Sequence, residues 1–124
     1  MVFLLIALGG AAGSVTRYAV DTWVSERAAS AFPWGTFVVN LSGSFVLGVL
    51  FALAIERDAL PATIRAPLMI GFLGAYTTFS TLTLETWRLV EGGAGVLALA
   101  NLVGSVALGV GAVVLGLAAG RVLT

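Results

Sequence analysis

The chain has 124 residues, of which 60% are hydrophobic and only 10% charged, and its mean hydropathy is +1.10. Soluble domains carry about 25% charged residues, so this composition indicates a membrane protein with one small domain over residues 1–124. The charges of six acidic and six basic residues cancel, so no basic surface for nucleic acid is expected. The chain has no Cys and no His, which excludes disulfides, thiol nucleophiles, common zinc sites and most catalytic triads. We therefore expect that the protein is not an enzyme.

Four apolar segments are long enough to cross a membrane, which takes ~20 residues each. They run over residues 2–23, 34–55, 67–89 and 96–119 and predict an all-α, multi-pass membrane fold in a lipid bilayer. No Lys or Arg precedes the first segment and no clear cleavage site follows it, so we expect a span there and not a signal peptide. Trp23, Trp34 and Trp87 fall near span ends, where interfacial aromatic residues are common.

The arginines divide evenly between the two sides of the membrane. In this topology three of them (57, 65 and 121) share the side of the N-terminus and three (17, 27 and 88) the other side. The positive-inside rule then has no bias to act on, so the chain is expected to insert both ways and to pair as an antiparallel, dual-topology homodimer. The alternative interpretation is that so short a count is noise.

The first two spans each hold a polar group at a position where polarity is costly. In the first, Gly9 and Gly13 form a GxxxG pattern that permits close helix packing, and Arg17 follows. Arg17 either extends to the lipid headgroups or faces a water-filled vestibule and attracts anions. In the second, Asn40 either bonds to another helix or directs its amide donors at a passing anion.

The third span is a poor helix over the stretch from Gly71 to Thr81. This stretch combines glycines at 71 and 74 with Thr77, Thr78, Ser80 and Thr81, and both residue types weaken a helix interior. A broken helix at membrane depth tends to line a cavity or hold an ion, because its freed backbone groups need partners. The alternative is an intact helix with its hydroxyls bonded to the preceding turn.

Polar side chains continue beyond this stretch. Thr77, Thr81 and Glu85 are spaced at i, i+4 and i+8, so a continuous helix would place them on one face. Glu85 is a functional candidate as an ionisable residue inside a span, although a position near the interface, one turn from Arg88, is the alternative. Ser80 and Thr83 would form an adjacent polar strip.

The fourth span adds Asn101 and Ser105 at i and i+4. The spans together therefore offer neutral donors and a single acid. Such a set suits a small dehydrated anion, because neutral donors replace its hydration without a fixed charge that would trap it. Phe79 is a further candidate, since the edge of an aromatic ring is positive.

These motifs together resemble the CrcB, or Fluc, family of small fluoride channels. The resemblance covers all four spans in order, and its most specific part is the run from Thr77 to Thr81 after Gly71-Phe72-x-Gly74. The other matching residues are Gly9, Gly10, Gly13, Arg17 and Tyr18; Gly35, Thr36, Val39, Asn40, Gly43, Ser44 and Phe45; Glu85; and Asn101, Gly104 and Ser105.

The resemblance implies an antiparallel homodimer in the inner (plasma) membrane through which fluoride leaves the cytoplasm passively, relieving its toxicity. It implies a structural sodium ion at the dimer centre, held by the backbone carbonyls of Gly74 and Thr77 of both chains. It implies a fluoride pathway formed by Arg17, Thr36, Asn40, Phe79, Ser80, Thr83, Glu85, Asn101 and Ser105. Leu82 departs from the family, which usually has a second phenylalanine there, and Asn101 stands where some members have tyrosine.

Two other functions are open to a small four-span chain. A multidrug transporter that exchanges protons for cationic drugs would need an acid within the first span, and none occurs before Asp21. A structural membrane subunit would use the polar residues for packing alone.

Overall fold

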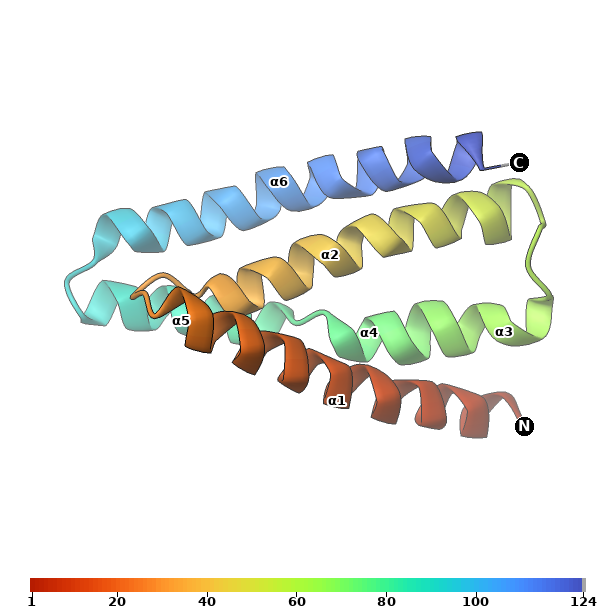
Figure 1. Ribbon diagram of the computed structural model, residues 1–124, viewed down its shortest axis with the longest axis horizontal. Helices are drawn as coiled ribbons and strands as arrows, with labels where there is room; N and C mark the ends of the chain where they lie inside the picture. Colours follow the sequence, from red (N-terminus) through yellow and green to blue (C-terminus); the bar gives the residue numbers. More distant parts are fainter. Residues whose placement is uncertain (124) are drawn as a thin grey trace.

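In the computed structural model, which describes residues 1–123, the chain folds into four antiparallel helical rods (Figure 1). Each rod is long and apolar enough to cross a membrane, which confirms the predicted all-α, multi-pass architecture. The rods cover Val2–Ala28, Trp34–Glu56, Ala62–Glu91 and Gly95–Val122, and so extend a few residues beyond most ends of the predicted spans.

The first and last rods are single helices, whereas the middle two are composite. The elements in order are α1 (Val2–Ala28), α2 (Trp34–Phe51), the π-helical η1 (Ala52–Glu56), α3 (Ala62–Ala66), the π-helical η2 (Pro67–Phe72), α4 (Leu73–Tyr76), α5 (Phe79–Glu91) and α6 (Gly95–Val122). Both termini lie at the same end of the bundle as the loop between η1 and α3, and the other two connections lie at the opposite end (Figure 1).

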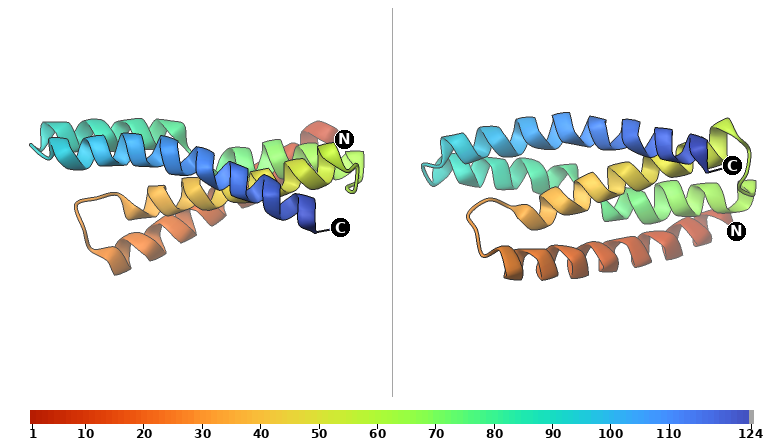
Figure 2. Two further views of the ribbon diagram at one scale, coloured as in Figure 1. Left: turned by 90° about the horizontal axis from the view of Figure 1, so that it is seen from above. Right: turned by 45° about the horizontal axis from the view of Figure 1, so that its top comes forward.

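The central rod is α2, with α1 and α6 on opposite sides of it (Figures 1 and 2). α1 packs against α2, η2 and α4, while α6 packs along α2 and α5. Val39, Leu73 and Tyr76 form a small cluster in the buried core, with Phe72 stacked on Tyr76. Most large apolar side chains on α1 and α6 face outward, as hydrocarbon-exposed helices require.

Glycines bring the rods close together where they touch. A Cβ on Gly13 would overlap the Phe72 carbonyl, so the GxxxG pattern of the first span contacts η2. A Cβ on Gly116 would overlap the Phe45 carbonyl, and one on Gly120 would approach Val49 O to 2.8 Å. Small residues thus let α1 meet the third rod and α6 meet α2 at backbone distance.

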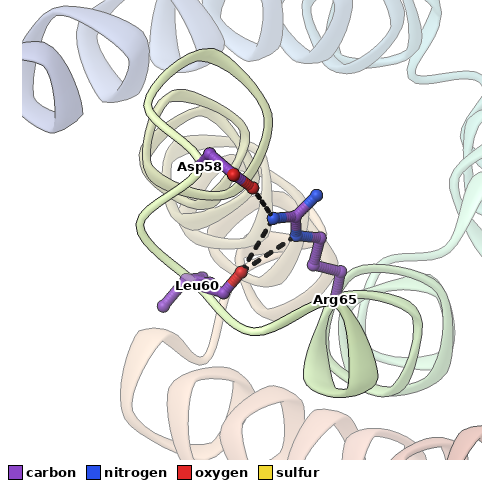
Figure 3. A network of polar contacts seen from close by, with 3 residues as sticks. All are labelled: Asp58, Leu60 and Arg65. Carbon is purple, nitrogen blue, oxygen red and sulfur yellow. Dashed lines mark hydrogen bonds and ion pairs between the residues drawn. The ribbon is translucent and has the colours of Figure 1, made fainter.

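Two arginines form hydrogen bonds and ion pairs at the end of the bundle that carries the termini. The guanidinium of Arg65 donates to the Asp58 carboxylate and, over 2.9 and 3.1 Å, to the Leu60 carbonyl (Figure 3). Arg121, at the end of α6, pairs through two nitrogens with the two carboxylate oxygens of Glu56, each at 2.9 Å. The short loop after η1 is therefore held on both of its sides.

Candidate ion pathway at the helix break

The third rod is broken at Thr77 and Thr78, in the middle of the bundle. Thr77 (φ −80°, ψ 155°) and Thr78 (φ −148°, ψ 114°) are both extended, and they separate α4 from α5. The predicted interruption is therefore present. The predicted common face of Thr77, Thr81 and Glu85 is wrong, because Thr77 lies outside the helix that carries the other two.

The break changes the hydrogen bonds of four successive carbonyls, those of residues 74–77. In an unbroken helix the Gly74 carbonyl would accept the Thr78 N–H and the Thr77 carbonyl the Thr81 N–H. Instead the Thr78 N–H donates to Asn40 Oδ1 at 2.8 Å, and the Thr81 N–H donates to Thr78 Oγ1 at 3.2 Å. Within residues 1–123 the carbonyls of Gly74 and Thr77 receive no hydrogen bond.

Arg17 lies beside this break. Its Nε donates to the Ala75 carbonyl over 3.0 Å, and the side chain is half-buried between α1 and α4. The Ala75 carbonyl would otherwise also lack its helical partner, since the chain turns away two residues later. The sequence predicted a costly cation at this level but gave no sign of this backbone partner.

Asn40 contacts the break from α2. Its Nδ2 donates to the Thr78 carbonyl at 3.1 Å while its Oδ1 accepts from the N–H of the same residue. One turn further along α2, Gly43 is buried against Thr77, and a Cβ there would overlap the threonine methyl group. Asn40 was predicted from the sequence as a site residue. Its partner Thr78 was noted only as one residue of the stretch from Gly71 to Thr81.

Phe79 and the polar strip of α5 lie on the outside of the helical bundle. Phe79 is 75% exposed, and Ser80 and Thr83 are exposed as well. Leu82, by contrast, is buried at 6% exposure. The outer surface of α5 thus carries hydroxyls at membrane depth beside the exposed ring of Phe79.

Thr36 and Glu85 each carry a buried side-chain oxygen, Oγ1 and Oε1, that has no hydrogen-bond partner within residues 1–123. Thr36 is 2% exposed. Glu85 lines a polar hollow of about 370 Å³ with Ser25, Ser30 and Arg88 at the end of the bundle. The acid thus lies between the break and the exposed end of α5, where α1 and α2 are connected.

Asn101 and Ser105 are buried between α6 and α5. Asn101 Nδ2 donates to Thr86 Oγ1 at 2.9 Å, and Thr86 Oγ1 donates to the Leu82 carbonyl at 2.8 Å. Ser105 Oγ reaches Asn101 Oδ1 at 3.5 Å. The sequence analysis did not identify Thr86 as the partner of Asn101. The only available indication was that a buried asparagine needs a hydrogen-bond partner.

One hollow of about 230 Å³ brings several of the predicted residues together. Asn40, Phe79 and Ser105 line it with Leu82 and the two threonines of the break. Glu85 belongs instead to the hollow at the end of the bundle, and Arg17 reaches the break from the α1 side. The predicted residues therefore form a chain of polar positions along the third rod and not one compact cluster.

The fold and this polar chain define a four-span integral membrane protein whose third span is interrupted at mid-depth. The family model described as "CrcB-like protein, Camphor Resistance (CrcB)" matches residues 4–117, and the chain belongs to this family. Similar proteins include one from Magnetococcus marinus, 48% identical over 118 residues that cover 95% of this chain and 96% of the relative. A protein from Hahella chejuensis is 46% identical over 118 residues (95% and 93%). Both relatives are named fluoride-specific ion channel FluC.

Proposed function

We propose that this chain is a fluoride-specific ion channel, as the names of its relatives state for those proteins. The observation that carries the proposal is the outward-facing strip of Phe79, Ser80 and Thr83 beside an interrupted span. Hydroxyls and a ring edge are neutral groups with positive ends, so they replace the water around a small anion without trapping it. Asn40, Ser105, Thr36, Asn101, Glu85 and Arg17 extend the same path in both directions.

The second element of the proposal is a homodimer. Hydroxyls and a free carbonyl facing hydrocarbon are costly, so the exposed strip and Gly74 need a covering surface of protein. A second copy in the opposite orientation supplies one. The arginines at the two ends of the bundle number three (57, 65 and 121) and two (27 and 88), and so small a difference favours that arrangement. The exposed Phe79 would then enter the partner's surface.

The third element is a sodium ion between the two copies. The carbonyls of Gly74 and Thr77 fit such an ion, because the break removes their helical hydrogen bonds and oxygen ligands suit hard cations. Gly74 is exposed, and its missing side chain leaves its carbonyl approachable. When bound, the ion would join the two copies and add positive potential near the anion path.

Transport is proposed to be passive and to lead fluoride out of the cytoplasm across the inner (plasma) membrane. The test is the purified chain in liposomes loaded with potassium fluoride, with valinomycin to carry the compensating potassium and a fluoride electrode outside. Rapid, saturating fluoride release with no chloride release is expected. Absence of release would leave a structural subunit, and proton-driven uptake of a cationic dye would indicate a multidrug transporter instead.

A further inference from the structure

The contact between Asn40 and Thr78 is a two-point pairing. The carboxamide of Asn40 accepts from the Thr78 N–H at 2.8 Å and donates to the Thr78 carbonyl at 3.1 Å. Both backbone groups of one residue are therefore satisfied by one side chain. A primary carboxamide offers a donor and an acceptor on the same planar group, and the chain has just two asparagines and no glutamine.

This pairing competes directly with helix continuation. If α4 continued, the Thr78 N–H would bond to the Gly74 carbonyl. Asn40 takes that N–H. The Thr78 carbonyl, as the N-cap of α5, still accepts the N–H of Leu82, and it also accepts from Asn40 Nδ2. The extended conformation of Thr78 therefore loses no hydrogen bond relative to the helix, and the Gly74 carbonyl stays free.

Two neighbours of the pair complete the turn of the chain. Gly43, on the same face of α2 as Asn40, leaves room for the Thr77 methyl group. On the other side, Thr78 Oγ1 accepts the Thr81 N–H and caps the new helix α5. α2 thus fixes where the chain leaves α4, and the cap fixes where α5 begins with Phe79.

We propose that Asn40 is a positioning residue of the helix break. It holds Thr78 in the extended conformation, and through Thr78 it keeps the Gly74 carbonyl free and directs Phe79 to the outer face of the protomer. Its Oδ1 and one Nδ2 hydrogen are engaged with backbone, so it acts on conduction through this geometry, and its second Nδ2 hydrogen is left for the anion path. That last consequence rests on the proposed channel function, whereas the pairing itself does not.

The test uses nuclear magnetic resonance of the full-length chain in detergent micelles, with nitrogen-15 in threonine and asparagine. Because the chain has two asparagines and no glutamine, the side-chain amide region holds only two pairs of signals. Asn101→Ala removes one pair and so assigns the other to Asn40. The Thr78 backbone amide is assigned as the signal lost in Thr78→Ser grown with labelled threonine.

We expect slow solvent exchange for the Thr78 amide and for one Asn40 side-chain proton in the wild type. In Asn40→Ala the Thr78 amide should exchange faster by on the order of tenfold, since it loses its acceptor. Asn101→Ala, the matched control, should leave it unchanged. Asn40→Asp keeps the acceptor and loses the donor, so Thr78 N–H protection should persist while fluoride release falls; this variant also covers the case in which the alanine variant does not fold.

An unchanged Thr78 amide in a folded Asn40→Ala protein would overturn the proposal and return Asn40 to direct contact with the ion. Fast exchange of both the Thr78 amide and the Asn40 side chain in the wild type would overturn it as well. A protected Thr78 amide in a wild-type protein that releases no fluoride would instead refute the channel function and leave the pairing intact.

Discussion

Arg17 and Ala75 are joined by a hydrogen bond of 3.0 Å from the guanidinium Nε to the backbone carbonyl, across 58 residues of sequence. The bond places the charged side chain of α1 at the break in the third rod. It supplies a partner to a carbonyl that the break would otherwise leave bare. Arg17 thus has a structural hydrogen bond to the backbone in addition to its proposed role of attracting anions.

Removing this bond should destabilise the protein. Arg17→Ala leaves the half-buried Ala75 carbonyl without its donor, and a loss of about 1–3 kcal/mol in the free energy of unfolding is expected. Arg27→Ala is the control on the same helix, because Arg27 is exposed and contacts Trp23 at the helix end. Denaturant titration of both variants in detergent measures the difference, and equal stabilities would contradict the expectation.

Gly43→Ala should disturb the break from the α2 side. The added Cβ would overlap the Thr77 methyl group and separate α2 from the third rod, at a cost of about 1–3 kcal/mol. Gly111→Ala is the matched control, because nothing lies within 4 Å of a Cβ there. Thermal unfolding of the two variants should differ clearly, and a Gly43→Ala protein as stable as the control would show that the close approach is not needed.

Added positive charge should convert the proposed dual topology into a single orientation of insertion. Ala59 and Thr63 are exposed near the loop between η1 and α3, so Ala59→Lys and Thr63→Lys add positive charge at that end without disturbing packing. The chain has no cysteine, and a single Ser30→Cys then reports orientation by labelling from outside. We expect one orientation and no fluoride release, with release restored by a copy biased through Ala28→Lys and Ala31→Lys.

Full fluoride release by the forced orientation alone would rule out the antiparallel pair. The unmodified chain with Ser30→Cys is the reference and should be labelled from both sides in similar amounts.

Phe79 and Leu82 line the same hollow of about 230 Å³ and are expected to differ in importance. Phe79→Ile removes the ring edge and should lower fluoride release roughly tenfold, because ~1.4 kcal/mol at a barrier changes a rate by that factor. Leu82→Phe adds a ring beside that hollow and should preserve or raise release. Flux measured in matched liposomes would oppose this view if both variants were equally and mildly affected.

Sodium removal tests the proposed ion between the two copies. Replacing sodium by a large organic cation through prolonged dialysis should lower dimer stability and fluoride release together. Gly74→Val should act in the same direction, although a Cβ at Gly74 meets only Met69 O at 4.0 Å within its own chain. Its effect would therefore come from the second copy. A dimer indifferent to both changes would exclude the ion.

The sequence was sufficient for the spans and the interruption, because both depend on local composition. Four apolar runs predicted four rods, and glycine with threonine predicted the break near Thr77. The prediction that Thr77 and Glu85 share a helix face was wrong, because a helical spacing cannot be continued across a break. The roles in fluoride conduction assigned to single side chains stay predictions.

The partners of the polar side chains could not be predicted from the sequence. Arg17 and Asn40 bond to backbone groups 58 and 38 residues away, and a backbone carbonyl carries no signature in the sequence. The pairing of Asn101 with Thr86 likewise depends on how α5 and α6 align. What the sequence showed was that these groups needed partners, because unsatisfied polar groups in hydrocarbon are costly.

The break also divides the third rod into two halves that pack against different helices. Its first half, from α3 to α4, packs on α1, whereas α5 packs on α6, and α2 touches both parts. During synthesis the contacts of α1 with this first half are therefore available before α6 has been made. The contacts of α5 with α6 can form only after α6 has been made, so the two-residue break at Thr77 and Thr78 divides contacts that are available early from contacts that are available late.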